Sequence, residues 1–199
     1  MKKIFLLSLI SFAVFYLVSC KKDSDNTPAG GNLIGNYKFI SLTAATTSTQ
    51  IVDDGSTVDK TVTRSNYTTT NNTGTLVVDA TKMISADLSY SVSTTATADF
   101  YEDGVLIDTQ DVPFQADIPS SGATSEYKVI SSDSLYFPSG SAISGGVVAS
   151  SDPGGCKYRF EADKLILTVN GEKTTQQSQA GVSITSINKA NVIATYQKQ

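Results

Sequence analysis

A strict alternation of large apolar residues with serine, in the segment Leu88–Ser93, constrains the fold of this chain more than any other feature. Successive side chains of a strand point to opposite faces, so this pattern predicts a strand with one buried face and one solvated face. From Leu33 onward the chain is rich in Ser, Thr, Val and Ile with the same period of two. No window carries the 3.6-residue apolar repeat of a helix. The sequence therefore predicts one all-β domain over residues 33–199.

Turn signals divide this domain into about ten short antiparallel strands, the spacing typical of a barrel or a sandwich. Asp53–Ser56 predicts a turn, and Asn71–Gly74 predicts a loop. Asp103-Gly104 and Asn170-Gly171 each predict a two-residue hairpin turn, because such turns require positive φ at both positions. The expected strands of these two hairpins are 97–102 with 105–111, and 165–169 with 172–176. Val112–Pro119, with two prolines, predicts an irregular crossing.

The remaining strand predictions lie on both sides of a small-residue stretch, Ser139–Gly155, which predicts a long loop with a short strand at Gly146–Ala149. Before this stretch, Tyr127–Ile130 and Ser134–Phe137 are predicted strands. After it come a strand in which Cys156, Tyr158 and Phe160 share one face, and two more strands at 182–187 and 192–197. We favour an up-and-down barrel of about 8–10 strands, with a β-sandwich as the alternative.

The first twenty residues predict an exported, membrane-anchored protein. Lys2 and Lys3 precede an apolar run, Ile4–Val18, that is shorter than the ~20 residues needed to span a bilayer. The run ends in Leu17-Val18-Ser19-Cys20, which resembles the bacterial lipobox, and the resemblance implies removal of residues 1–19 and lipidation of Cys20. An ordinary secretory signal is the alternative. Residues 20–32, with Pro28, Gly30 and Gly31, predict a flexible tether.

Composition excludes several classes of function. The formal net charge is −4 and the pI is near 4.7, so no basic face for nucleic acid is expected. The chain has no histidine, which removes the commonest general base and the commonest metal ligand. No nucleophile motif is present either. We therefore expect a protein that is not an enzyme, with no catalytic residues, no metal and no cofactor.

Three segments, at the two ends of the domain, resemble a known family. Leu33–Phe39 is similar to the opening strand of the lipocalin-like (calycin-like) lipoproteins common in Bacteroidetes, with Tyr37 at the position of the family's tryptophan. Tyr158–Leu167 and Ala194–Lys198 resemble the aromatic and closing strands of the same family. The resemblance covers the two ends of the domain and implies a lipocalin-like β-barrel, a binding fold, in a protein of the cell envelope anchored at the outer membrane.

Aromatic residues are the candidate ligand contacts, because inward-facing rings line apolar pockets. An equally physical reading is that they fill the core. The candidate ligand-binding residues are Tyr37, Phe39, Tyr90, Phe100, Tyr158 and Phe160. We expect the domain to bind a small, partly apolar ligand; the alternative is an interaction module with a filled core that recognises glycan or protein through its loops.

Two further features have simple structural explanations. Cys156 follows two glycines and precedes Tyr158, so it is expected to be a small core residue rather than a reactive thiol. Asp99 and Asp111 could oppose each other across the Asp103-Gly104 hairpin, as a carboxylate-based hydrolase would need. Charges exposed on strands are the expected outcome.

Overall fold

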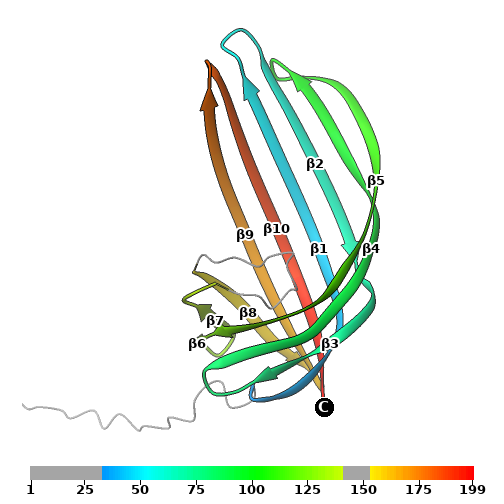
Figure 1. Ribbon diagram of the computed structural model, residues 1–199, viewed down its shortest axis with the longest axis vertical. Coiled ribbons are helices and arrows are strands. Elements are labelled where there is room, and N and C mark those ends of the chain that lie inside the picture. Colours follow the sequence, from blue (N-terminus) through cyan, green and yellow to red (C-terminus); the bar gives the residue numbers. More distant parts are fainter. Residues whose placement is uncertain (1–32, 141–152) are drawn as a thin grey trace, which may run out of the picture.

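The computed structural model describes residues 33–140 and 153–199, and within these ranges the chain is built from antiparallel strands without helix (Figure 1). The predicted all-β fold class is confirmed. The described strands are β1 (Gly35–Asp53), β2 (Val58–Thr68), β3 (Thr70–Val78), β4 (Lys82–Glu102), β5 (Val105–Glu126), β6 (Lys128–Ser131), β7 (Ser134–Phe137), β8 (Gly154–Glu161), β9 (Lys164–Gln179) and β10 (Val182–Lys198).

All these strands belong to one sheet in which neighbours in sequence are mostly neighbours in space. The order is β2-β4-β3-β1-β10-β9-β8-β7-β6, with β5 beside β4 and β2 also beside β1. The first strand pairs with the last along most of its length, from Tyr37 opposite Lys198 to Asp53 opposite Ser183. β2 and β3 share one place in the sheet, because both lie between β1 and β4 at different heights.

Thr69 separates β2 from β3 and connects both to β1. Its backbone N–H donates to the Leu42 carbonyl at 2.8 Å, and its hydroxyl accepts a hydrogen bond from the Leu42 N–H at 2.9 Å. The same hydroxyl donates to Asn72 Oδ1 at 2.6 Å. Thr69 is buried, and these bonds satisfy its polar groups where the strand ladder is interrupted.

One end of the sheet encloses the hydrophobic core, which is built by alternating residues. In β1 the buried residues are Tyr37 and Phe39 and then, after a bulge between Phe39 and Ser41, Leu42 and Ala44. The facing residues of β10 are Val192, Ala194 and Tyr196, also buried. The other buried members of this core cluster are Leu33, Leu76, Val78, Met83, Leu88, Tyr90, Val92, Tyr127, Leu135, Phe137, Cys156, Tyr158, Leu165 and Leu167.

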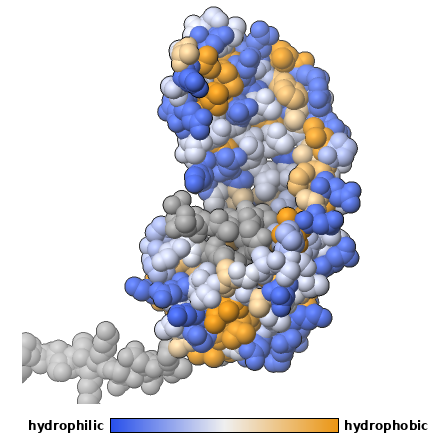
Figure 2. Space-filling view, in the orientation of Figure 1, coloured by the Kyte–Doolittle hydropathy of each residue, from blue (hydrophilic) through white to orange (hydrophobic). Residues whose placement is uncertain are grey.

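Beyond the core, six strands continue as a region that we call the sheet extension: residues 45–68, 93–115 and 170–191 of β1, β2, β4, β5, β9 and β10 (Figure 1). Only Ala96 and Ala98 are buried there. Both faces of this layer therefore contact solvent among the described residues. Figure 2 shows hydrophilic residues over much of the surface, with hydrophobic patches at both ends of the molecule; in the sheet extension the exposed Val105, Leu106 and Ile107 follow the β4–β5 turn. The many threonines suit strands with two wet faces, because a β-branched residue favours the strand while its hydroxyl stays hydrated.

Two predicted turns are confirmed. Asp103 and Gly104 join β4 to β5 with φ of 47° and 81°. The turn at Asp53–Ser56 is present, and the Asp54 carboxylate accepts hydrogen bonds from the backbone N–H groups of Ser56 and Thr57 at 2.8 and 2.9 Å. These bonds and that of the Ser56 hydroxyl, which is the largest cause, lower the pKa of Asp54 to about 2.

The predicted hairpin at Asn170-Gly171 is wrong. β9 runs through both residues, with Asn170 opposite Asn191 and Gly171 opposite Ala190. The chain turns instead at Ala180-Gly181, where φ is 52° and 85°. An Asn-Gly pair permits a tight turn without requiring one, and here the continuous ladder with β10 determines its conformation. The two strands predicted at 182–187 and 192–197 are likewise one strand, β10.

The predicted loop at Asn71–Gly74 is also wrong, since these residues lie in β3. The residues that suggested a loop instead mark bulges: φ is 52° at Asn71 and 112° at Gly74, and the register with β4 shifts on both sides of Thr73. A bulge inserts an extra residue into a strand and often uses a left-handed conformation. Turn-forming residues therefore bend this strand without ending it.

The irregular crossing predicted for Val112–Pro119 is a paired part of β5, with Pro113 opposite Thr95 of β4. β5 pairs only with β4 over this length, so the missing proline N–H costs no ladder hydrogen bond on an edge strand. The predicted leader (1–19), Cys20 with the tether (20–32) and the strand at Gly146–Ala149 lie outside the described residues.

Candidate functional site

The six aromatic residues predicted to contact a ligand all point toward the core side of the sheet, and most of them are packed against other side chains. Tyr37 and Phe39 are 0% and 2% exposed. The Phe39 ring lies 6.1 Å from the ring of Tyr90 and 5.5 Å from that of Tyr196, measured between centroids. These distances are typical of direct aromatic packing. The structure thus packs two predicted residues, Phe39 and Tyr90, with Tyr196, which the candidate set did not include; Tyr37 belongs to the same core cluster.

The other three predicted residues lie outside this aromatic contact, although Tyr158 belongs to the same core cluster and Phe160 packs against it. Tyr158 is buried in β8 and contacts the half-buried Phe160, with ring centroids 6.4 Å apart in an edge-to-face arrangement. Phe100 lies farther along β4, outside the core cluster, opposite Asp108. The six residues therefore do not form a single site.

The buried tyrosines are neutral hydrogen-bond donors. The Tyr37 hydroxyl donates to the Leu33 carbonyl at 2.8 Å, and the Tyr127 hydroxyl donates to the Asp79 carbonyl at 2.6 Å. Desolvation raises the pKa of Tyr90 to about 12 and raises the pKa of Tyr196 as well. Their hydroxyl groups accordingly fix ring positions in the core and do not act as bases near neutral pH.

Cys156 is a core residue, as predicted. It is 4% exposed and pairs with Leu135 of β7. Desolvation raises the pKa of its thiol to about 12, although a backbone hydrogen bond opposes this shift. The nucleophilic thiolate is therefore scarce at physiological pH.

The two carboxylates of the Asp103-Gly104 hairpin, Asp99 and Asp111, do not lie directly opposite each other. Asp111 lies opposite Thr97 and accepts a hydrogen bond from the Thr97 hydroxyl at 3.1 Å, while Asp99 lies opposite Thr109. Asp99 accepts Arg64 Nη1 at 2.6 Å, a bond that lowers the pKa of Asp99. Both carboxylates are hydrogen-bonded to neutral or cationic partners, as expected for charges on exposed strands. In the described residues, no three His, Cys, Asp or Glu side chains are grouped so that they could hold a metal ion.

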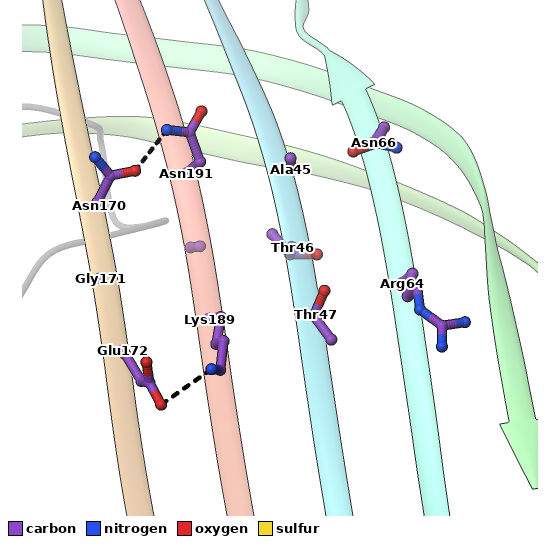
Figure 3. Close-up of a pocket in the computed structure, with 11 residues that line it drawn as sticks. Ala45, Thr46, Thr47, Arg64, Asn66, Asn170, Gly171, Glu172, Lys189 and Asn191 are labelled. Carbon is purple, nitrogen blue, oxygen red and sulfur yellow. Dashed lines mark hydrogen bonds and ion pairs between the residues drawn. The ribbon is translucent and has the colours of Figure 1, made fainter.

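Among the described residues, the structure shows a hollow on the sheet extension, on the face opposite the core (Figure 3). Ala45 and Thr47 of β1 form its floor, and Ala44, which precedes them in the alternation, is buried on the core side. We call this hollow the outer groove; its volume is about 480 Å³. Its lining residues are Ala45, Thr46, Thr47, Arg64, Asn66, Asn170, Gly171, Glu172, Lys189, Ala190 and Asn191.

Two walls border the outer groove along β1. On the β10 and β9 side, Asn191 Nδ2 donates to Asn170 Oδ1 at 2.6 Å, and Lys189 Nζ lies 3.2 Å from Glu172 Oε1. On the β2 side stand Asn66 and Arg64 (Figure 3). Since neighbouring strands lie about 4.8 Å apart, these walls are about 10 Å apart, wide enough for one extended chain.

The polar groups of the walls retain hydrogen-bonding capacity. The Asn170–Asn191 bond uses one donor of Asn191 and one acceptor lone pair of Asn170, so each amide has further donor and acceptor positions. The charges are balanced in pairs, Lys189 with Glu172 and Arg64 with Asp99. The outer groove therefore offers amides and hydroxyls without strong net charge, which suits a hydroxyl-rich or amide-rich ligand.

No local sequence signal indicates the outer groove, and the reason is physical. Asn170 was assigned to a turn, and the polar residues of β1 and β2 have the composition of any solvated strand face. Only the register places Asn170, Asn191, Ala45 and Asn66 in one row across four strands.

Among the described residues, no helix is long and apolar enough to cross a lipid bilayer. Comparison of the chain with protein-family models, with curated proteins and with solved structures found no match.

Proposed function

We propose that this protein is a lipid-anchored interaction module of the cell envelope, and that it recognises a glycan or a protein on the surface of its sheet. The observation that carries the proposal is the packing of the interior, where Phe39 is held between Tyr90 and Tyr196. Rings packed in this way occupy the space that a small apolar ligand would need. The lipid anchor at Cys20 is part of the proposal and rests on the sequence of the leader.

The core end of the sheet supports a lipocalin-like barrel as the framework. β5 ends at Glu126 and β6 begins at Lys128, with only Tyr127 between them. β5 pairs with β4, β6 pairs with β7, and the Tyr127 N–H donates to the Thr81 carbonyl at 2.9 Å. Together with the β1–β10 ladder, this continuity favours a sheet that closes on itself around the core.

The outer groove is the binding surface that fits this function best, with glycan as the favoured partner. Carbohydrate hydroxyls need several donors and acceptors in one place, and Asn66, Asn170 and Asn191 present amides along both walls. The small floor residue Ala45 leaves room for a ring between them. Most of the lining residues have polar or charged side chains, which favours a ligand rich in hydroxyl groups over a purely apolar one.

The experiment is a glycan-array screen of the purified protein, followed by affinity measurements on two matched variants. Asn191→Ala removes an amide from the outer groove, whereas Asn188→Ala removes an amide from the opposite face of the same strand. We expect the protein to bind at least one glycan. Asn191→Ala should weaken this binding about tenfold or more, because it removes hydrogen bonds worth about 1.5 kcal/mol, and Asn188→Ala should leave the affinity unchanged. If the two substitutions change the affinity equally, the outer groove is not the binding surface. If no glycan binds and a small molecule is found bound to the protein, the proposal is wrong.

A further inference from the structure

One long edge of the sheet extension is unpaired in the described part of the chain. β8 pairs with β9 only from Lys164 to Thr168. Beyond Thr168, β9 continues to Gln179 with β10 as its one neighbour, and it borders the sheet extension in Figure 1. The free edge therefore runs from Val169 to Gln179, and we call it the β9 edge.

The register shows which backbone groups of the β9 edge point outward. The Ala180-Gly181 turn has positive φ at both residues, so the flanking pair, Gln179 and Val182, exchanges hydrogen bonds. Bonded and non-bonded pairs then alternate without a register shift. The N–H and C=O groups that point away from β10 are those of Asn170, Glu172, Thr174, Gln176 and Ser178.

The opposite edge, β5, is protected against pairing with another strand. Pro113 and Pro119 interrupt its row of N–H donors, and Asp111 and Asp117 place negative charge along it. Proline and charge are the usual means by which proteins keep edge strands from pairing. The β9 edge contains no proline, and its acid and base, Glu172 and Lys173, are adjacent and opposite in sign. The contrast identifies the β9 edge as the one able to accept a strand.

We propose that the β9 edge pairs with the β9 edge of a second copy of this chain, in antiparallel orientation about a two-fold axis perpendicular to the sheet. Such an axis places the same face of both copies on the same side of the joined sheet. Directly opposed residues share a face, so the two residues of each pair must both have even sequence numbers or both have odd ones. An axis centred on Thr174 pairs the whole edge, from Val169 opposite Gln179 of the second copy to Gln179 opposite Val169 of the second copy. The five outward-pointing residues then pair only with one another, so their donors and acceptors are all satisfied.

The side chains also fit this register. Glu172 lies opposite Gln176 of the second copy, and Lys173 lies opposite Thr175 of the second copy. No like charges oppose each other, and threonine pairs such as Thr174 with its own copy are favourable across strands. The interface is isologous, so it closes at two copies and leaves no edge for a filament.

The first experiment is disulfide trapping in the full-length protein. In Thr174→Cys the two introduced cysteines lie directly opposite each other. Their Cα atoms are about 5.5 Å apart, a separation that a disulfide can span. We expect mild oxidation to give a covalent dimer of Thr174→Cys, and no dimer of the parent chain or of Gln115→Cys on the β5 edge. Glu172→Cys alone and Gln176→Cys alone should form no covalent dimer on oxidation, whereas the two variants should give a covalent dimer when co-expressed.

The second experiment measures the mass of the full-length protein in detergent by light scattering. Thr174→Pro removes an outward N–H without removing a bond to β10, so it should halve the mass, whereas Thr174→Ser should not. Absence of the Thr174→Cys disulfide, equal crosslinking of Gln115→Cys, or a monomeric parent protein would each overturn the proposal. Crosslinking of Glu172→Cys with itself would reject the stated register.

Discussion

Replacement of Phe39 by alanine tests whether the interior of this domain is solid. Phe39 is 2% exposed and lies between the rings of Tyr90 and Tyr196. In a filled core the truncation leaves a cavity whose walls lose their contacts. In a domain built around a ligand cavity, the same truncation would only enlarge a space that already exists.

The magnitude follows from the packing. When a buried phenylalanine is truncated to alanine and neighbouring atoms cannot fill the space, the variant is about 3–5 kcal/mol less stable than the parent protein. The two aromatic contacts contribute about 0.5–1.5 kcal/mol each within that total. We therefore expect a loss of about 4 kcal/mol, a large share of the roughly 5–15 kcal/mol of a typical domain.

The assay is urea unfolding of the purified protein, followed by tyrosine fluorescence and circular dichroism. With a slope of about 2 kcal/mol per molar urea, the midpoint should fall by about 2 M. Phe114→Ala is the matched control, because Phe114 is 50% exposed and its loss should cost about 0.5 kcal/mol or less. If the two variants lose the same stability, the interior near Phe39 is not filled and the reasoning fails.

Four other outcomes are expected. Gly74→Ala should destabilise the protein by about 2 kcal/mol or more in the same urea assay, because φ is +112° and a Cβ would lie 2.7 Å from a neighbouring backbone Cα; an unchanged midpoint would contradict the bulge. Cys156 should react with iodoacetamide only after unfolding, since burial raises its pKa to about 12, and rapid alkylation of the native protein at pH 7.5 would refute its burial. The Asp54 carboxyl should titrate near pH 2 by NMR, and a titration midpoint near pH 4 would contradict the hydrogen bonds of this turn. Because folding lowers its pKa from 3.8, its contribution to stability is present above pH 3.8 and is lost as the pH falls toward 2. Cys20→Ser should move the protein from the membrane fraction to the soluble fraction, and retention at the membrane would remove the lipid anchor.

The fold class was predictable from local patterns, because burial on one face of a strand leaves a period of two in the sequence. Leu88, Tyr90 and Val92 alternate with serine, and all three are buried in β4. Asp103-Gly104 was equally clear, since few residue pairs tolerate two positive φ angles. These features depend on a residue and its nearest neighbours alone.

The length of the strands was not predictable from such signals. Asn170-Gly171 and Asn71–Gly74 have the residues of turns, yet cross-strand partners keep them in β9 and β3. Pro113 is compatible with a strand only because that strand is an edge. Each of these outcomes depends on strands distant in sequence.

The candidate site was predictable only in part. Tyr37, Phe39 and Tyr90 were correctly expected to face the interior, because large rings at alternating positions indicate a core. The outer groove requires the register of four strands, which no local pattern encodes. Its Asn and Thr residues are typical of any solvated strand face.

Native mass spectrometry of the protein purified from its own host tests the central claim most directly. A solid interior with binding on the sheet surface predicts the mass of the chain and its lipid, with no small apolar molecule retained, in a protein that still binds a glycan. A stoichiometric small molecule that is released only on unfolding would contradict the account.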